Sequence, residues 1–150
     1  MTRWYDLELV VDANVLFSAL IKDGVTRRLL INSGWRFYAP EFIFEEIRKH
    51  SNYLSNKIGT SKSSLWQMLE EFLMYADIQI IPFSEFREFY IKFRKISPDI
   101  NDAHYLALAA KFSCAVWTND KELQKQSDVR ICTTNELFEI LSGKNKISRI

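Results

Sequence analysis

The stretch Leu-Glu-Leu-Val-Val-Asp-Ala-Asn-Val-Leu-Phe-Ser-Ala-Leu-Ile, residues 7–21, contains the pattern that decides the fold. Its first part, Leu7 to Val11, is a short apolar run with the length and composition of a buried β-strand. From Asn14 onward the apolar side chains have helical spacing. A buried strand followed directly by a helix is the first unit of an α/β domain. Asp12 lies at the junction, where such a domain exposes a side chain.

The rest of the chain repeats this alternation of strand and helix. We expect further strands at residues 35–39, 78–81, 115–117 and 129–132. We expect further helices at residues 26–32, 40–50, 61–75, 84–95, 101–111, 119–126 and 133–141, and a polar connection at residues 52–60. Strands that alternate with helices imply crossover connections. The sequence therefore predicts a single-domain three-layer α/β/α sandwich with a mostly parallel, roughly five-stranded sheet.

Two helix starts have local signals. Pro40 suits the first turn of the helix expected at residues 40–50, where its missing N–H leaves no hydrogen bond unmade. Thr133 and Glu136 have the spacing of a capping box and predict the start of the last helix.

Length and composition are those of one globular domain. The chain has 150 residues, of which 47% are hydrophobic and 26% charged, and its net charge is +1. We expect a domain over residues 1–142 and a basic tail over residues 143–150. The first residues lack an apolar signal-peptide core, and no run is long enough to span a membrane. The two cysteines, Cys114 and Cys132, are too few for a disulfide framework. A cytoplasmic location is therefore expected.

Four carboxylates, far apart in the chain, lie where a folded α/β domain exposes side chains. They are Asp12, Glu46, Asp102 and Asp120. The carboxyl ends of parallel strands open onto one shared edge, where ligands bind. Carboxylates gathered there repel one another unless a cation is present. Because no His or Cys cluster accompanies them, the cluster suits Mg²⁺ better than zinc. The sequence therefore predicts a divalent metal site.

Two of the four have an alternative interpretation as helix caps. Asp12 follows a strand and has the position of an N-cap, although Asn14 is an alternative cap that would leave Asp12 free. Asp120 lies in a turn where Asn119 and Glu122 have the spacing to cap a short helix.

The other two must be separated from an acidic neighbour. Glu45 has the spacing of a solvated helix pair with Lys49, whereas Glu46 borders the apolar face of the same helix. Asp99 and Asp102 flank a helix start, where the helix dipole favours both. The helix after Asp102 is apolar all round and therefore buried, so Asp102 is the candidate ligand and Asp99 a supporting or capping residue.

Four segments, in order, resemble the motifs of PIN-domain nucleases. They are VVDANVLFSAL at residues 10–20, PEFIFEEI at 40–47, DINDAHYLALA at 99–109 and WTND at 117–120. The resemblance spans about residues 8–140 and is greatest to the prokaryotic stand-alone PIN proteins, which are similar to VapC-type toxins.

This resemblance implies a metal-dependent ribonuclease that hydrolyses RNA phosphodiesters with a metal-activated water. Its acidic quartet, which would hold Mg²⁺ or Mn²⁺, corresponds here to Asp12, Glu46, Asp102 and Asp120. Asn14, Thr118 and Asn119 fall on polar positions that support the site in this family. Many relatives have an acidic pair before the Ala-rich helix. Here Asn101 is neutral, and Asp99 is the candidate that replaces the missing charge.

The resemblance also implies partners: RNA as substrate, a small antitoxin protein and a second copy in a homodimer. Cationic side chains near the expected ligand edge are candidate RNA contacts, although a side chain of this kind is more often a solvated surface charge. They are Arg27, Arg28, Lys49 with His50, Lys121 and Lys125, with Lys144, Lys146 and Arg149 in the tail.

Two other classes of protein compete with a nuclease. Phosphoryl-transfer α/β domains are disfavoured because a dehalogenase-like phosphatase needs a second Asp where Asn14 stands, and a receiver domain needs an Asp where Pro82 follows the third strand. The other class is a scaffold of the same fold that binds RNA or a protein without cutting. The intact quartet disfavours it.

Overall fold

A computed structural model describes residues 6–22 and 24–143 of the chain. Its centre is a five-stranded parallel sheet in the order β3-β2-β1-β4-β5. The strands are β1 (Glu8–Val11), β2 (Arg36–Pro40), β3 (Ile78–Ile81), β4 (Ala115–Trp117) and β5 (Ile131–Cys132). The order runs outward from β1 to β3 and then returns to β4 on the other side of β1. The direction of winding therefore reverses between β1 and β4, and the carboxyl ends of these two strands flank the switch point.

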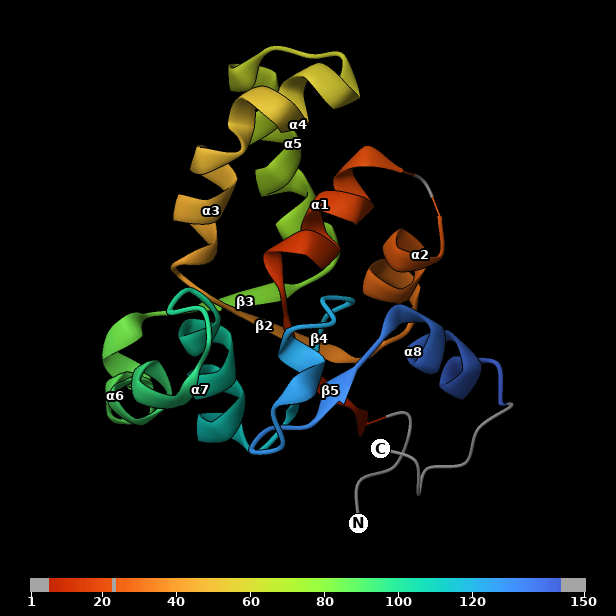
Figure 1. Cartoon of the computed structure of the whole chain (residues 1–150). Helices are drawn as coiled ribbons and strands as arrows, with labels where there is room; N and C mark the ends of the chain where they lie inside the picture. The colour runs from red at the N-terminus through yellow and green to blue at the C-terminus, as the bar shows by residue number, and fades with distance from the viewer. Residues whose placement is uncertain (1–5, 23, 144–150) are drawn as a thin grey trace.

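Helices cover both faces of this sheet. They are α1 (Ala13–Ile21), α2 (Val25–Asn32), α3 (Ile43–Lys49), α4 (Ser51–Ile58), α5 (Lys62–Tyr75), α6 (Arg87–Ile96), α7 (Asp102–Phe112) and α8 (Thr134–Leu141), with short 3-10 turns η2 (Phe83–Glu85) and η3 (Leu123–Lys125). On one face α7 packs against β1, β2 and β4, with α6 outside it; on the other, α1, α2 and α8 pack together (Figure 1). The predicted three-layer sandwich with a parallel five-stranded sheet is confirmed.

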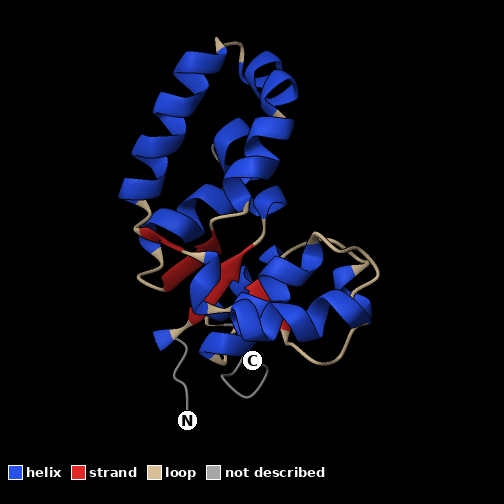
Figure 2. Cartoon of the chain, turned by 90° about the vertical axis from the view of Figure 1, so that its left-hand side faces the viewer, coloured by secondary structure: helices blue, strands red, loops and turns tan. Residues whose placement is uncertain are grey.

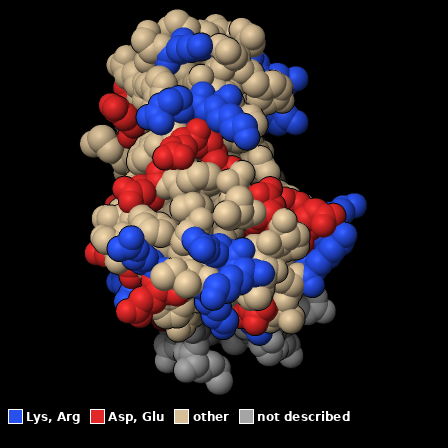
Figure 3. Space-filling view, turned by 60° about the vertical axis from the view of Figure 1, so that its left-hand side comes forward, with Lys and Arg blue, Asp and Glu red and all other residues tan. Residues whose placement is uncertain are grey.

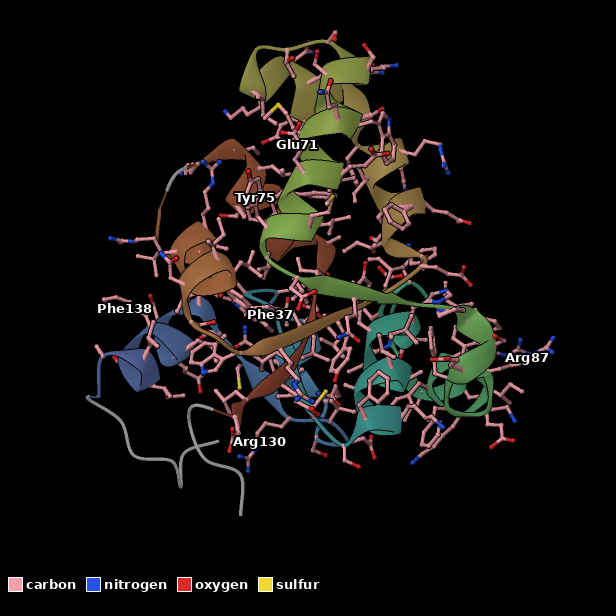
Figure 4. All side chains as sticks on the ribbon, turned by 180° about the vertical axis from the view of Figure 1, so that it is seen from behind. Phe37, Glu71, Tyr75, Arg87, Arg130 and Phe138 are labelled. Carbon is pink, nitrogen blue, oxygen red and sulfur yellow. The ribbon has the colours of Figure 1, made fainter. Side chains whose placement is uncertain are left out.

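The core explains why β1 is apolar at consecutive positions. Leu9, Val10 and Val11 are each 0% exposed because helices cover both faces of the sheet. Phe37 of β2 lies inside the molecule (Figure 4), and the centroid of its ring is 5.8 Å from that of Trp117 in β4. The apolar helix α7 is buried along most of its length, as its composition predicts.

Helices α3, α4 and α5 form an arm that extends away from the sheet (Figures 1 and 2). The expected polar connection at residues 52–60 is wrong, because residues 51–58 form α4. Leu54 anchors this helix in the interior, and the Ser51 and Ser55 hydroxyls donate to carbonyls three residues earlier. Gly59 ends α4 at a φ of 82°, a conformation that favours glycine.

Pro40 does not open a helix as expected. It is the last residue of β2 and pairs with Ile81 of β3. The nitrogen of residue 40 faces β1, as that of Arg36 does, and the pairing of β1 with β2 ends at Val10 and Tyr38. The strand therefore accommodates proline at its end, and α3 begins at Ile43.

Three other expected elements differ from those in the structure. The helix expected at residues 119–126 is only η3, the helix expected at 84–95 is divided between η2 and α6, and the strand expected at 129–132 is β5 alone. The capping box of Thr133 and Glu136 is confirmed at the start of α8. The charged residues of the tail, 144–150, lie outside the described residues.

Both cysteines are free thiols. Burial raises the pKa of Cys114 and that of Cys132 to about 12, so both thiols stay protonated near neutral pH. None of the described helices has the length and apolar character needed to cross a membrane.

Candidate metal site at the carboxyl edge of the sheet

Asp12 and the loop that carries Asp120 lie side by side at the switch point of the sheet. Val11 pairs with Trp117, so the residues that follow β1 and β4 emerge side by side. The Asp12 N–H donates to the Trp117 carbonyl at 3.1 Å and extends the pairing by one residue. Asp12 and Thr118 are consequently held at the same edge, where parallel sheets bind ligands.

Thr118 joins Asp12 to the loop that carries Asp120. Its buried hydroxyl donates to Asp12 Oδ2 at 2.7 Å and accepts the backbone N–H of Asp120 at 3.0 Å. One side chain therefore fixes both carboxylate-bearing segments. Asp12 occupies the N-cap position of α1 without a capping side-chain bond, and the alternative of Asn14 as cap is wrong because Asn14 lies exposed inside α1.

Asn119 and Asp120 organise their loop in different ways. The Asn119 amide donates to Thr134 Oγ1 at 2.9 Å and accepts the Thr134 N–H at 2.9 Å, which fastens the loop to the start of α8. Asp120 Oδ1 accepts the N–H of Glu122 at 2.9 Å. The alternative interpretation, in which Asn119 and Glu122 cap a short helix, is therefore wrong: Asn119 anchors the loop to α8, and η3 has no side-chain cap.

Glu46 reaches the site from α3, in the arm. Glu46 is half-buried, whereas Glu45 is exposed. The prediction that Glu46, and not Glu45, borders the buried face of this helix is confirmed. The hydroxyl of Tyr105, in α7, donates to Glu46 Oε1. Tyr105 is 1% exposed, and the sequence patterns do not predict a role for it at this site. The signal in the sequence that could have indicated one is a hydroxyl-bearing side chain within the apolar part of α7.

Asp102 starts α7 and lies among other carboxylates. Burial, and then the nearby charges of Asp99, Asp12, Asp120 and Glu46 in that order, together raise its pKa from 3.8 to about 7. The charges of the other three quartet members therefore all act on Asp102. Asp99 is exposed, and its Oδ1 accepts the Asn101 N–H at 2.9 Å.

The pKa values of Asp12 and Glu46 are also raised by burial. Burial raises the pKa of Asp12, while its bond from Thr118 and the amides of Ala13 and Asn14 act in the opposite direction. Burial also raises the pKa of Glu46, against the bond from Tyr105. Carboxylates that are costly to ionise yet hydrogen-bonded in their charged form are suited to a cation partner.

The positions of the carboxylates and their chemistry point in different directions. Among residues 6–22 and 24–143, no group of three or more His, Cys, Asp or Glu side chains is placed so that it could hold a metal ion. The interacting groups supply only oxygen ligands, and Mg²⁺ prefers such ligands while keeping several of its waters. Joint binding of an ion by the four carboxylates therefore stays a prediction.

The surface around the site has both signs of charge. Figure 3 shows Asp and Glu side chains gathered across the middle of one face, with Lys and Arg above them on the arm and below them. Two of the cations expected to contact RNA already have partners within the protein. Arg27 Nε donates to the Ala19 carbonyl at 2.8 Å, and Lys125 forms an ion pair with Glu122 at 3.0 Å.

A cavity of about 790 Å³ lies away from the quartet. Its lining includes Glu8, Cys114 and Arg130, near the amino ends of β1, β4 and β5. None of the four carboxylates lines it.

A family model for the PIN domain matches residues 10–141. The chain belongs to the PIN domain family. PIN domains are generally nucleases, and in this PIN domain the match covers all four carboxylates and the strand order that gathers them. No curated protein matches the chain.

Solved structures share the fold of this PIN domain. VapBC2 from Rickettsia felis, bound to a DNA fragment from its promoter, aligns with a TM-score of 0.66 at 14% identity, over 85% of this chain and 98% of that one. PAE2754 from Pyrobaculum aerophilum aligns with a TM-score of 0.58 at 14% identity, over 94% of this chain and 92% of that one. At this identity both matches show the fold alone.

Proposed function

We propose that this PIN domain is a metal-dependent ribonuclease that hydrolyses RNA phosphodiesters with a metal-activated water. The observation that carries the proposal is the Thr118 hydroxyl, which joins Asp12 to the loop of Asp120 at the switch point of a PIN domain. A bound Mg²⁺ or Mn²⁺ would supply an acidified water and neutralise charge on the phosphate oxygens.

The protein's own contribution is to hold these oxygens in place. Thr118 fixes Asp12 and the loop of Asp120, and Tyr105 fixes Glu46. Asp102 adds a carboxylate whose charge is unfavourable until a cation arrives. In the proposed roles, all four bind the metal, while Asn14, Asp99, Thr118 and Asn119 support them.

The test is RNA cleavage by the purified protein with and without divalent ions. We expect cleavage with Mg²⁺ or Mn²⁺, none with a chelator, and recovery when Mn²⁺ is restored. Persistent cleavage in chelator would contradict the metal requirement. Metal binding without cleavage of any RNA would favour the non-cutting scaffold.

We also propose that the protein acts in the cytoplasm as a homodimer and is the toxin of a toxin–antitoxin pair. The family match and the likeness to VapBC2 support a small antitoxin as its partner. Co-expression with a short neighbouring reading frame should relieve growth arrest caused by the protein alone. Absence of growth arrest would contradict the toxin role but leave the cleavage chemistry in place.

A Thr118→Val variant should lose activity without losing the fold. Valine keeps the shape of threonine but removes the hydroxyl that bonds Asp12, so we expect kcat/KM for RNA to fall roughly 10–100-fold. Leaving buried Asp12 without this donor should also cost about 1–3 kcal/mol of unfolding free energy. Thr118→Ser keeps the hydroxyl and should retain most activity. Equal rates for Thr118→Val and the wild type would refute this role.

A further inference from the structure

Helix α6 has a stripe of cations on its outer side. Its sequence contains four cationic residues and one carboxylate, Glu88. Arg87, Arg94 and Lys95 are spaced so that they lie on one side of an α-helix. All three are exposed, and Arg87 extends outward from α6, away from the sheet (Figure 4). The other side of the helix is buried at Phe93 and packs against α7.

The cations of this stripe have no partner among the described residues. The ion pairs within that part of the chain join Arg36 to Glu8 and Lys125 to Glu122, and neither involves α6. The side chains of the stripe also donate no hydrogen bond to the described residues. The helix lies on the side of the molecule that Figure 3 turns forward, where Lys and Arg side chains lie below the acidic ones. The charge of the stripe is therefore available to an external anion.

A cluster of four aromatic rings adjoins the stripe. Its members are Phe42 before α3, Phe83 in η2, Tyr90 in α6 and His104 in α7. The ring centroid of His104 lies 4.1 Å from that of Phe42, in parallel stacking, and 4.6 Å from that of Tyr90. The Phe83 ring meets the Tyr90 ring edge-on at 5.0 Å. All four residues are partly exposed, and Tyr90 lies one helical turn before Arg94.

The same cluster borders the carboxyl edge of the sheet. Phe42 lies one helical turn before Glu46, and His104 lies two residues after Asp102. The ring stack between Phe42 and His104 therefore joins the starts of α3 and α7, which carry these two carboxylates. Together, the rings and the stripe form a surface that runs from this edge onto α6.

The two parts of this surface suit different parts of a nucleotide. Cations attract phosphates, and aromatic rings stack on unpaired bases of any sequence. Burial lowers the pKa of His104, and the nearby charges of Glu45 and Glu41 oppose this shift. Negative charge beside the rings disfavours a phosphate there and leaves the bases as the groups that contact them. Such a combination is typical of proteins that bind single-stranded nucleic acid.

We propose that the stripe of Arg87, Arg94 and Lys95 and the ring cluster beside it bind single-stranded RNA and lead it to the carboxyl edge of the sheet. The inference rests on the proposed ribonuclease function for its substrate, but it requires no bound metal. Phosphates contact the stripe, and unpaired bases stack on the rings. Double-stranded RNA lacks unpaired bases and gains only the contacts to phosphate.

The test is RNA binding in chelator, where cleavage does not contribute. Fluorescence anisotropy of a short, labelled single-stranded RNA measures its affinity for the whole protein over a range of salt concentrations. The triple variant Arg87→Gln, Arg94→Gln, Lys95→Gln should bind on the order of 100-fold more weakly than the wild type at low salt. The plot of log affinity against log salt should become shallower by about 2, because each lost phosphate contact removes about 0.7 from its slope.

A second triple variant is the matched control: Arg36→Gln, Lys111→Gln, Arg130→Gln. It also removes two arginines and one lysine, all exposed, but these lie near the amino ends of the strands, at the opposite edge of the sheet. Its affinity and its salt dependence should stay close to those of the wild type.

A Tyr90→Leu variant tests the rings separately from the charges. Leucine keeps an apolar side chain between α6 and α7 but removes the stacking surface, so single-stranded RNA should bind about tenfold more weakly with an unchanged salt slope. Tyr75→Leu, at a residue that is 77% exposed at the end of α5, should have no effect. Double-stranded RNA should bind Tyr90→Leu and the wild type equally.

Each outcome decides the proposal. Equal losses in the two triple variants, or full affinity in the α6 variant, would overturn it. Binding of an acidic peptide, but not of RNA, through the stripe would also overturn it and assign α6 to a protein partner. If the α6 variant binds and cuts RNA as the wild type does, this inference fails and the proposed function stands. If the wild type binds RNA through α6 but cuts none with Mg²⁺ or Mn²⁺, the proposed function fails and this surface stands.

Discussion

An Asp12→Asn variant should cleave RNA on the order of 10³-fold more slowly than the wild type. Asp12 is only 6% exposed, lies at the switch point and is fixed by Thr118. Asparagine has nearly the same shape and still accepts the Thr118 hydroxyl, but it removes the charge that would bind the metal. The loss should appear in kcat under saturating Mg²⁺, measured on a single-stranded RNA.

The same variant should not be less stable. Burial makes the Asp12 charge costly, since it raises the pKa of this group, so a neutral side chain relieves that cost. Asp128→Asn is the control, because Asp128 is exposed and adjoins the cavity near the amino ends of the strands. Cleavage by Asp12→Asn at the rate of Asp128→Asn would mean that the quartet is wrongly assigned.

An Asp102→Asn variant should be more stable than the wild type in chelator, and increasingly so as pH rises. The pKa of Asp102 is raised from 3.8 to about 7. Between these values the folded state holds a proton that the unfolded chain has released. The wild type therefore loses unfolding free energy as pH rises through this window, and the loss levels off above it. The burial of Asp12 and Glu46 acts in the same direction.

Thermal melts measure this effect. At about pH 8 we expect Tm of Asp102→Asn to exceed that of the wild type by on the order of 5 °C, and by less at about pH 5. Excess Mg²⁺ should narrow the gap, because a cation stabilises the charged wild-type site and binds the variant less well. A Tm difference that is independent of both pH and Mg²⁺ would show that Asp102 does not share a space with the other carboxylates.

Most of the fold could be predicted because its strongest signals are local. The apolar run of β1 and the all-round apolar α7 are each buried on every side, and their composition shows it. The connection expected at residues 52–60 failed for the opposite reason. Leu54 is the one strongly apolar residue early in α4, and its partners lie in other parts of the chain. The helix start expected at Pro40 is wrong because Pro40 ends β2, beyond the last residue of that strand that pairs with β1.

The sequence predicts which residues belong to the candidate site, but not the hydrogen bonds that join them. Sequence patterns place Asp12 and Asp120 after strands, yet the hydroxyl that joins their segments becomes visible only when β1 and β4 pair. Tyr105 could not be assigned because its partner is on a distant helix. The bonds of Asn119, a proposed supporting residue, run to Thr134, and no sequence pattern predicts this partner at the start of α8.

The reversal of winding between β1 and β4 also has a consequence for biosynthesis. The bond between Thr118 and Asp12 joins residues 106 apart in the chain, and β4 begins at Ala115. A ribosome must therefore deliver the chain as far as β4 before the central pair of strands can close, and long-range closure of this kind is slow. Nascent fragments that end before β4 lack the assembled edge, so any hydrolytic capacity would arise only after β4 has emerged.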